Sequence, residues 1–345
     1  MAATSTTETW DAAWTLTLRK NRKRLTDNIF DEYPLLAAMR KSGKVEIEDG
    51  GKEFQEDVMY AKNSGTWFSG YDTVNTAAVD GITAAFYVPR YISVPVTISM
   101  TEEVESNAVG SKKLLEAKQD QTMLTARDSV SSAMFGATSG KIMLGLQDII
   151  ADNPTSGTVG GINRANESWW RNQYSATSTT FLTQTKTNVF DGWEALGAKY
   201  NDCSSGNDQP DIIVTTLALM SDVEASRAGQ GYTTLVDGSG TRNQLGEVGD
   251  IKFKKAVIVS DRDCAASHFY LINTKYLKLK VMSSLNFAKT PFKENTDQHA
   301  KVAHVVFGGQ LTTNNPRRLG VLSNVSSPCS QANGSSTLPI GERNN

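Results

Sequence analysis

The pair of residues best placed to act as a nucleophile and its base is Cys264 with His268, four residues later. A cysteine nucleophile has to be held as a thiolate, and its base has to be oriented by a third group. The residues around this pair give no argument for either condition. We therefore expect both side chains to be buried or incidental, and the sequence predicts no catalytic residue.

Two glycine-rich segments approach the patterns of nucleotide-binding loops. Gly136-Ala137-Thr138-Ser139-Gly140-Lys141 lacks the first glycine of a phosphate-binding loop, where Phe135 stands, and lacks its hydroxyl, where Ile142 stands. Gly238-Ser239-Gly240 begins like a dinucleotide fingerprint, but Asn243 occupies the third glycine position. The first segment fails its motif at two positions, and a flexible loop explains the second better, so the sequence predicts no cofactor.

Metal ligands are equally scarce. Two of the three histidines, His299 and His304, are five residues apart. Because side chains alternate along a strand, this spacing places them on opposite faces of the strand that we predict there. The cysteines Cys203, Cys264 and Cys329 form no CxxC pair, and an odd number of them is typical of free thiols in a reducing compartment. The sequence therefore predicts no metal site.

The composition is that of a globular protein. The 345 residues are 39% hydrophobic, and 35 basic against 37 acidic side chains leave a formal charge of −2. A chain of this length can form two domains, and a near-neutral charge argues against a strongly basic nucleic-acid binder. Its longest apolar stretches, such as Asp211 to Met220, are far shorter than the ~20 residues of a membrane span. Met1 to Thr9 lacks the apolar core of a secretion signal, so we expect a cytoplasmic protein without a membrane partner.

The first 43 residues are predicted to form an extended or helical arm. A basic run within it has no acidic neighbour before Asp27, and it consists of Arg19, Lys20, Arg22, Lys23 and Arg24. Such a run suits an acidic or phosphate-bearing partner, and it equally suits the solvated face of a helix. Both interpretations stay open.

A long hairpin is predicted after the arm. Val45 to Glu48 alternates apolar and acidic residues, Gly50-Gly51 predicts a turn, and Glu53 to Tyr60 follows as a polar strand. The return strand is predicted over Tyr87 to Ile98, where prolines fit only a sheet edge. These strands have few apolar side chains to bury. We therefore expect a two-stranded projection, with three exposed aromatic residues in its turn-rich tip: Trp67, Phe68 and Tyr71.

Helices and strands are both expected in the rest of the chain. A long helix with one apolar face is predicted over Ser111 to Phe135. A loop-rich segment follows and contains Trp169-Trp170, which we interpret as core or interface anchors. The later predicted elements are helices 189–200 and 217–227, strands 211–215, 251–259, 269–273, 300–310 and 317–322, a strand or extended segment over 276–282, and a polar tail.

Several strings in this order resemble those of tailed-bacteriophage coat proteins. They are Val159-Gly160-Gly161-Ile162-Asn163-Arg164 followed by Trp169-Trp170-Arg171-Asn172-Gln173, then Pro210-Asp211-Ile212-Ile213-Val214-Thr215 with Val257-Ile258-Val259-Ser260, and Phe307-Gly308-Gly309-Gln310-Leu311 before Asn315-Pro316-Arg317-Arg318. The order of arm, long hairpin, long helix, α/β insert, return strand and tail is similar to the Hong Kong 97-like coat fold. Encapsulin shells share that fold.

The resemblance implies an α+β protein with five parts. They are an N-terminal arm (1–43), an extended loop (44–90), a peripheral domain with a long spine helix (91–185 and 290–325), an axial α/β domain (186–289) and a flexible tail (326–345). Some relatives carry a cleaved leader before the arm. The chain starts its arm almost at Met1, which implies either a removed leader or a separate scaffolding protein.

The implied function is structural and not enzymatic. Copies of the chain would assemble into pentamers and hexamers and form the icosahedral head around double-stranded DNA. The protein would then reside in the virion after assembly in the host cytoplasm. Scaffolding, portal and decoration proteins are further implied partners, and an encapsulin-like compartment is the alternative.

The candidate contacts between subunits are five aromatic residues: Trp67, Phe68, Tyr71, Trp169 and Trp170. An isolated two-stranded projection is marginal in water, so the hairpin is expected to gain stability by lying on a neighbouring subunit. Under the same resemblance, the basic run from Arg19 to Arg24 would face packaged DNA or an acidic interface.

Overall fold

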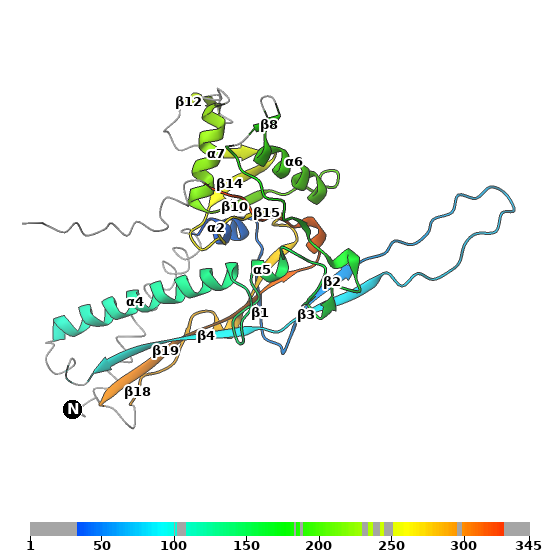
Figure 1. Cartoon of the computed structure of the whole chain (residues 1–345). Helices are drawn as coiled ribbons and strands as arrows, with labels where there is room; N and C mark the ends of the chain where they lie inside the picture. Colours follow the sequence, from blue (N-terminus) through cyan, green and yellow to red (C-terminus); the bar gives the residue numbers. More distant parts are fainter. Residues whose placement is uncertain are drawn as a thin grey trace, which may run out of the picture. The chain divides into compact units, whose positions relative to one another are not determined.

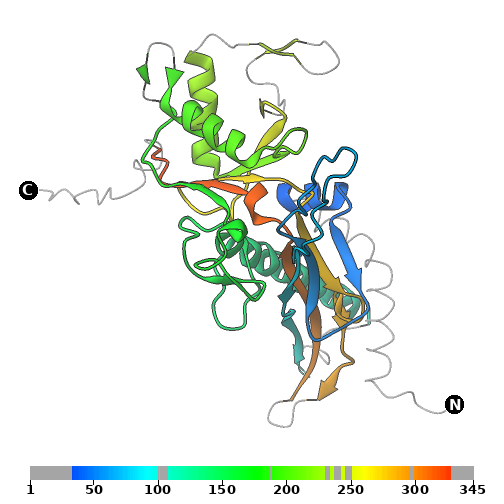
Figure 2. The ribbon, with the colours of Figure 1, turned by 90° about the vertical axis from the view of Figure 1, so that its right-hand side faces the viewer.

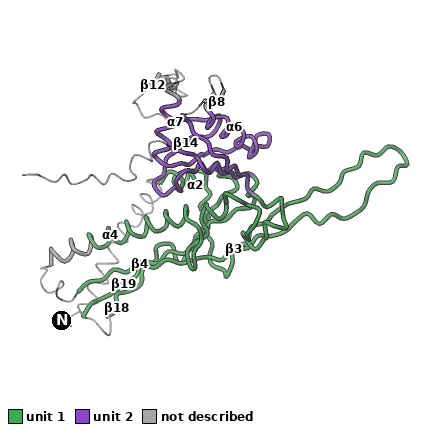
Figure 3. The backbone as a smooth tube through the Cα atoms, viewed as in Figure 1, with its two compact units in different colours: residues 1–171, 274–317 green, residues 172–273, 318–345 purple. Residues whose placement is uncertain are grey.

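The computed structural model describes residues 33–99, 101, 108–182, 184–186, 189–229, 234–236, 242–244, 251–294 and 299–327. The basic run from Arg19 to Arg24, Cys329 and the tail beyond residue 327 lie outside the described residues. The chain forms two compact units, residues 1–171 with 274–317 and residues 172–273 with 318–345 (Figure 3). Each unit has its own six-stranded sheet.

The sheet of the first unit is centred on the long strand β19, Ala300–Thr313. Strand β4, Arg90–Ser99, pairs antiparallel with one edge of β19. The other edge of β19 pairs with three shorter strands: β16 (Leu277–Met282), β17 (Ala288–Lys289) and β18 (Lys293–Glu294). Strand β1 (Val45–Glu48) pairs in parallel with β16. Figure 2 shows strands from early in the chain, in blue, beside strands from its last third, in gold and orange.

The long helix α4, Ala108–Phe135, packs against β4 of this sheet (Figure 1). Its residue Met123 joins Val96, Ala303 and Val305 of the sheet in one buried cluster. The predicted helix from residue 111 to 135 is therefore confirmed. Apolar residues at helical spacing identified it because they form the face that the sheet covers.

The described end of the predicted arm is helical. Residues 34–41 form the helix α2, Pro34–Lys41, whose Leu35, Leu36 and Met39 are buried. Proline fits the first position of a helix, where its missing N–H is not needed. These buried side chains make α2 part of the packed first unit.

The predicted pairing of the hairpin is also wrong. Strand β1 pairs with β16, and not across Gly50-Gly51 with the next strand. The true hairpin consists of β2, Phe54–Met59, and β3, Ile82–Tyr87, whereas the predicted return strand beyond Pro89 belongs to the large sheet as β4. Proline has no N–H for a strand ladder, which separates β3 from β4 at this point. A parallel partner far along the chain leaves no local signal.

The second unit has a mixed sheet in the order β13-β14-β10-β15-β20-β7. All four residues of its central strand β10, Ile212–Thr215, are buried, as its continuous apolar run predicted. The other strands are β13 (Ile251–Phe253), β14 (Ala256–Ser260), β15 (Phe269–Ile272), β20 (Gly320–Leu322) and β7 (Gln173–Ser175). Two small ladders join β8 (Gln184–Lys186) to β9 (Val189–Phe190) and β11 (Thr234–Val236) to β12 (Arg242–Gln244).

Two helices contact this sheet, α6 (Asp191–Cys203) and α7 (Leu217–Gly229). Trp193 of α6 donates its indole N–H to the Ser226 hydroxyl of α7 at 2.9 Å. The ring of Trp193 also meets Phe181 edge-on, so one side chain joins both helices to the apolar core. Among the described residues, no helix has both the length and the apolar character needed to cross a bilayer.

The limits of the two units differ from the predicted domain limits. Residues 172–185 and 318–325 were placed in the peripheral domain, but β7 and β20 pair with each other in the sheet of the second unit. Residues 274–289 were placed in the axial domain, but β16 and β17 pair with β19 of the first unit. The predicted strand over 251–259 is instead the tight hairpin β13–β14, which turns through Lys254 at φ +53°.

A buried carboxylate, Asp261, follows β14 in the second unit. One of its oxygens accepts the Asp263 N–H at 3.0 Å, and the other has no hydrogen-bond partner. Burial raises the pKa of Asp261 above its ordinary value and outweighs the opposing effect of that hydrogen bond. Between the unfolded and folded pKa values, the folded state therefore binds more protons than the unfolded state.

This difference predicts the sign of a pH effect. The contribution of the Asp261 carboxyl to the free energy of unfolding is fully present below its unfolded pKa of ~3.9. It is lost as the pH rises through the pKa of Asp261 in the folded state. The substitution Asp261→Asn should remove this dependence. The free energy of unfolding of the variant, relative to the wild type, should therefore increase between about pH 4 and pH 7. Urea unfolding of unassembled subunits across this range checks it, with the exposed Asp49→Asn as control; a constant difference would contradict the prediction.

Candidate subunit interface

The β2–β3 hairpin extends into a long loop that projects from the first unit (Figure 1). Every residue from 62 to 80 is exposed. Trp67 and Tyr71 are fully exposed, and Phe68 is two-thirds exposed. Large aromatic side chains gain by leaving water, so three of them on one loop favour contact with another molecule.

Among the described residues, the hydrogen bonds of the loop join parts of the hairpin to one another. The Ser69 N–H donates to the Asp72 carboxylate at 3.0 Å, and the Asn75 amide donates to the Ser64 hydroxyl at 2.9 Å. At the base of the loop, the Tyr60 N–H donates to the Gly81 carbonyl at 2.9 Å. The loop thus has local turns but no packing against the described body of its own unit.

The inner face of the hairpin base carries a buried charge. Glu56 lies between Phe54 and Val58 on β2, and all three are buried. Its carboxylate is 3.0 Å from the Lys280 ammonium and 3.4 Å from that of Lys278, both on β16. The hairpin is therefore attached to the large sheet through ion pairs as well as apolar contacts.

Further bonds complete this cluster. Lys280 also lies 3.2 Å from Glu48 and donates to the Gln55 carbonyl at 3.0 Å, while Lys278 lies 3.0 Å from Glu46. The Thr312 hydroxyl donates to Glu56 at 3.2 Å. We call Glu46, Glu48, Glu56, Lys278, Lys280 and Thr312 the hinge network. Fully bonded buried ions fix geometry even where their net stabilisation is small.

Both lysines of the hinge network stay charged at neutral pH. Burial lowers the pKa of Lys280, but the hydrogen bonds and charges of Glu56 and Glu48 outweigh it, so that the pKa rises above its ordinary value. Burial and the partners Glu46 and Glu56 act in the same way on Lys278. A raised lysine pKa stabilises the fold below the unfolded value of ~10.4, and this contribution is lost as pH rises through the folded value.

A compact loop supports the other side of the hairpin. It runs from β5 (Thr158–Val159) and β6 (Ile162–Asn163) to the 3₁₀ helix η1 (Ser168–Trp170). The Gly160 carbonyl accepts the Phe86 N–H of β3 at 2.9 Å. The Tyr87 hydroxyl donates to the Thr313 carbonyl at 2.7 Å, which ties β3 to the end of β19.

Two independent features of the backbone require glycine at position 160. Its φ is +60°, and an added Cβ would lie 2.9 Å from the Cβ of Ala85 and from the ring of Tyr87. Gly161 is a natural control, because its φ is +77° but a Cβ there would meet nothing within 4 Å.

We expect Gly161→Ala to lower the free energy of unfolding by about 1 kcal/mol through backbone strain alone. Gly160→Ala adds a steric clash and should cost about 2–4 kcal/mol. Chemical denaturation of the unassembled subunits measures both. Equal losses at the two positions would show that Gly160 does not hold the loop against the hairpin.

The paired tryptophans have different surroundings. Trp170 is completely buried and donates its indole N–H to the Val159 carbonyl at 2.9 Å. The prediction that Trp170 contacts another subunit is therefore wrong, because its ring fills the core of its own unit. Trp169 stacks on Tyr60 at 4.9 Å between ring centroids, so it supports the base of the projecting loop and stays partly exposed.

Two arginines hold the compact loop together. The buried Arg164 donates to the Asp148 carbonyl at 2.8 Å and also to the Ile149 carbonyl, at the end of the short helix α5, Leu146–Ile149. Burial lowers the pKa of Arg164. Arg171 donates to the Arg164 carbonyl at 2.7 Å. The string that carried the sequence resemblance is thus a structural brace for the hairpin base.

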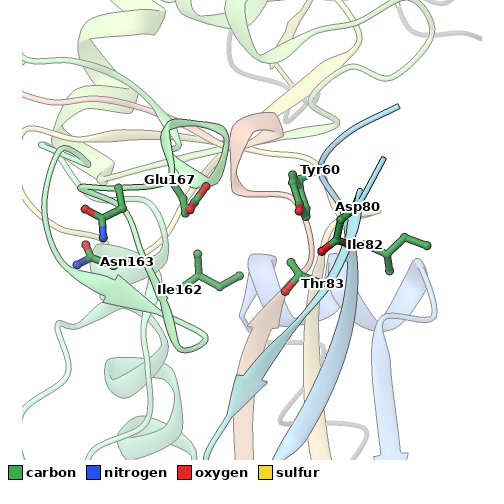
Figure 4. A pocket seen from close by; sticks show the side chains of 8 residues that line it. Tyr60, Asp80, Ile82, Thr83, Ile162, Asn163 and Glu167 are labelled. Carbon is green, nitrogen blue, oxygen red and sulfur yellow. The ribbon is translucent and has the colours of Figure 1, made fainter. Parts of the chain in front are cut away.

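A cavity of about 340 Å³ lies between this loop and the hairpin (Figure 4). Figure 4 shows Thr83 facing Ile162 across it, whereas Ile82 points away. The carboxylates of Asp80 and Glu167 also line the cavity. Among the described residues, no three histidine, cysteine or acidic side chains come together as metal ligands would. The cavity therefore offers polar groups but no metal-binding set.

The surroundings of Cys264 in the structure do not favour a nucleophile. Cys264 is buried, and burial raises the pKa of its thiol to about 12. The same holds for Cys203. A thiol in this state is a poor nucleophile at neutral pH. His268 stacks on Tyr270 instead.

The hinge network was missed by the sequence analysis, although the chain contains a signal for it. Glutamates alternate with apolar residues in β1, and lysines do so in β16. Opposite charges at the same period in separate strands indicate facing partners. The pairing itself depends on the tertiary fold, so alternation alone did not identify it.

Neither a protein-family model nor a curated protein sequence matches this chain. Solved structures do match. A subunit from the capsid asymmetric unit of cyanophage A-1(L) is 18% identical, with 82% of this chain and 90% of that chain covered and a TM-score of 0.60. The capsid of a native GTA particle gives 10% identity, coverage of 84% and 90%, and a TM-score of 0.53.

An encapsulin also matches, the holo-SrpI complex from Synechococcus elongatus PCC 7942. It is 8% identical, with coverage of 84% and 88% and a TM-score of 0.50. This chain therefore has the α+β coat fold, the Hong Kong 97-like fold, that phage capsid and encapsulin subunits share. The fold implied by the sequence resemblance is confirmed.

Proposed function

We propose that this chain is the major capsid protein of a tailed bacteriophage and acts structurally, without catalysis. The coat fold supports a shell subunit, and the projecting loop with three exposed aromatic side chains carries the proposal. Such a loop exposes apolar surface that is unfavourable in an isolated molecule. Contact with a neighbouring copy removes that surface from water.

The contact between copies would be heterologous, because a loop of one subunit meets a different surface of the next. Heterologous contacts that close produce rings, which here would be the pentamers and hexamers of an icosahedral head. The peripheral and axial domain roles would then fall to the first and second units. Scaffolding, portal and decoration proteins are the further partners proposed, in a particle assembled in the host cytoplasm.

The packaged partner would be double-stranded DNA, bound without sequence preference. The net charge of −2 suits a container, because each phosphate neutralised by the protein adds to binding that release of the genome must overcome. The basic run from Arg19 to Arg24 is proposed to face this DNA or an acidic interface.

Assembly of the purified chain tests the proposal. We expect size-exclusion chromatography and negative-stain microscopy of the recombinant protein to show rings or closed shells. Co-expression with a scaffolding protein should raise the yield of uniform shells if that protein replaces a leader. A compact monomer at all concentrations, or a specific catalytic activity, would contradict it.

An encapsulin-like compartment is the second candidate, because the SrpI encapsulin has the same fold. The contents of native particles separate the two functions. A capsid contains nuclease-protected double-stranded DNA and is encoded near portal and terminase genes. A compartment contains an enzyme cargo encoded beside the shell gene.

A further inference from the structure

The first unit has an open apolar groove beside its long helix. The groove has a volume of about 670 Å³ and lies among the last turns of α4, the start of β4, strand β19 and the segment after α4. Its apolar lining includes Tyr91, Ile92, Ala133, Ile142 and Phe307. Tyr91 and Ile142 are 54% and 46% exposed, so the groove is open to solvent. We call it the α4 groove.

The charged residues of the α4 groove favour an anionic occupant. Two cationic side chains, Arg90 and Lys141, line it together with Asp128. The Asp128 carboxylate already accepts a hydrogen bond from the Tyr33 hydroxyl at 2.7 Å. Neither cation forms an ion pair with a described residue. An occupant that is apolar and carries carboxylates would therefore match both the lining and the charge of the groove.

The described part of the chain begins at the edge of this groove. Tyr33 is its first residue, is buried, and is bonded to the lining residue Asp128. The Arg127 guanidinium also lies over the Tyr33 ring, 5.7 Å from its centroid. The segment that precedes Tyr33 is thus attached beside the groove. A tethered segment has a high effective concentration at a nearby site of its own molecule.

The predicted arm contains side chains that match the α4 groove. Trp10 and Trp14 are four residues apart, so they lie on one face of a helix formed there. Glu8 and Asp11 lie close to Trp10 in the sequence, and no lysine or arginine precedes Arg19. Helices with large apolar side chains at this spacing are common occupants of apolar grooves.

We propose that residues 8–18 of the arm dock in the α4 groove of the same molecule. The two tryptophans lie on the apolar lining, and the two carboxylates face the two cations. The 14 residues from 19 to 32 span about 45 Å when extended, which is long enough for the chain to turn back. The docked arm covers the groove in a free subunit, and the basic run stays outside it. The contact forms within one molecule and does not depend on the proposed shell function.

Cross-linking of dilute, unassembled subunits tests the contact. The variant carries Ala13→Cys in the arm and Ser132→Cys in the groove lining, on a Cys329→Ser background. Cys203 and Cys264 are buried, with thiol pKa values raised to about 12, so they react poorly. We expect a short bis-maleimide to join the two introduced thiols within one chain, as identified by peptide mass spectrometry.

A matched control replaces the groove thiol by Thr73→Cys, at an exposed position of the projecting loop. This control should give no link within the chain. Links of the arm thiol to Ser132→Cys of another chain would assign the arm to a second copy. The absence of any link would show that the arm does not reach the groove. Either result would overturn the proposal and leave the shell function standing.

Protection of the groove gives a second measurement that needs no cross-link. The single variant Ser132→Cys, on the same background, is modified with a bulky maleimide. Adding Trp10→Ser and Trp14→Ser should raise the rate of modification at least about tenfold, because the groove is then no longer covered most of the time. The rate at Thr73→Cys should be the same with either arm. Equal rates at Ser132→Cys with the two arms would overturn the docking contact.

Charge reversal tests the orientation of the docked arm. Lys141→Glu places a carboxylate where the arm is proposed to bring its own, so it should also raise the rate of modification at Ser132→Cys. Adding Glu8→Lys and Asp11→Lys to the same chain should restore protection. Failure to restore it would overturn the proposed facing of the charges.

Discussion

Replacement of Trp67, Phe68 and Tyr71 by serine is expected to abolish assembly at concentrations where the wild type forms shells. Each buried aromatic anchor of an interface contributes about 2 kcal/mol. Even partial loss of three anchors should raise the subunit concentration needed for assembly by about two orders of magnitude. Static light scattering over a dilution series measures this concentration.

The same triple variant should leave the free energy of unfolding of the unassembled subunit unchanged, because the replaced side chains are exposed. A matched control replaces three polar residues of the same loop by serine: Asn63, Thr73 and Thr76, all exposed. The control should assemble like the wild type. Normal assembly of the aromatic variant would show that the loop tip is not part of the interface. A large loss of stability would show that the tip packs on its own unit.

Breaking the hinge network is expected to lower the stability of a single subunit strongly. Glu56→Leu removes the shared partner of Lys278 and Lys280, both of which then lie in a partly dehydrated site. Removing one partner of a buried pair typically costs about 3–5 kcal/mol. Since Glu48 and Glu46 retain one contact to each lysine, we expect about 3 kcal/mol.

A double-mutant cycle separates pairing from packing. The double variant Glu56→Leu with Lys280→Met should lose less free energy of unfolding than the two single variants lose together. The difference should be about 1–3 kcal/mol, because neither charge is left buried alone. The rim variant Glu48→Gln, whose carboxylate is 41% exposed, should cost less than about 1 kcal/mol. Additive losses in the cycle would mean that Glu56 and Lys280 do not act as a pair.

The sequence predicted those parts of the fold whose signals are local. Helix α4 and strand β10 were identified because apolar spacing and a continuous apolar run reflect how they are buried. Pairings between distant strands were not predicted. The assignment of β1 to β16, and of β20 to the second unit, depends on contacts that alternate residues cannot specify.

The candidate interface was also predicted only in part. The exposed aromatics of the loop were expected from their turn-rich, weakly apolar surroundings, and they are exposed. Trp170 was misplaced because an adjacent pair of tryptophans looks the same in a core and at an interface. The hinge network emerges only when the strands are paired, because its members come from separate strands.

The central claim is that the projecting loop acquires its order by lying on a second copy of the chain. Hydrogen–deuterium exchange of residues 62–80 in unassembled subunits and in assembled shells tests it most directly. We predict rapid exchange of these amides in the free subunit and strong protection in the shell, with the amides of β19 protected in both. Equal exchange of the loop in the two states would contradict the account.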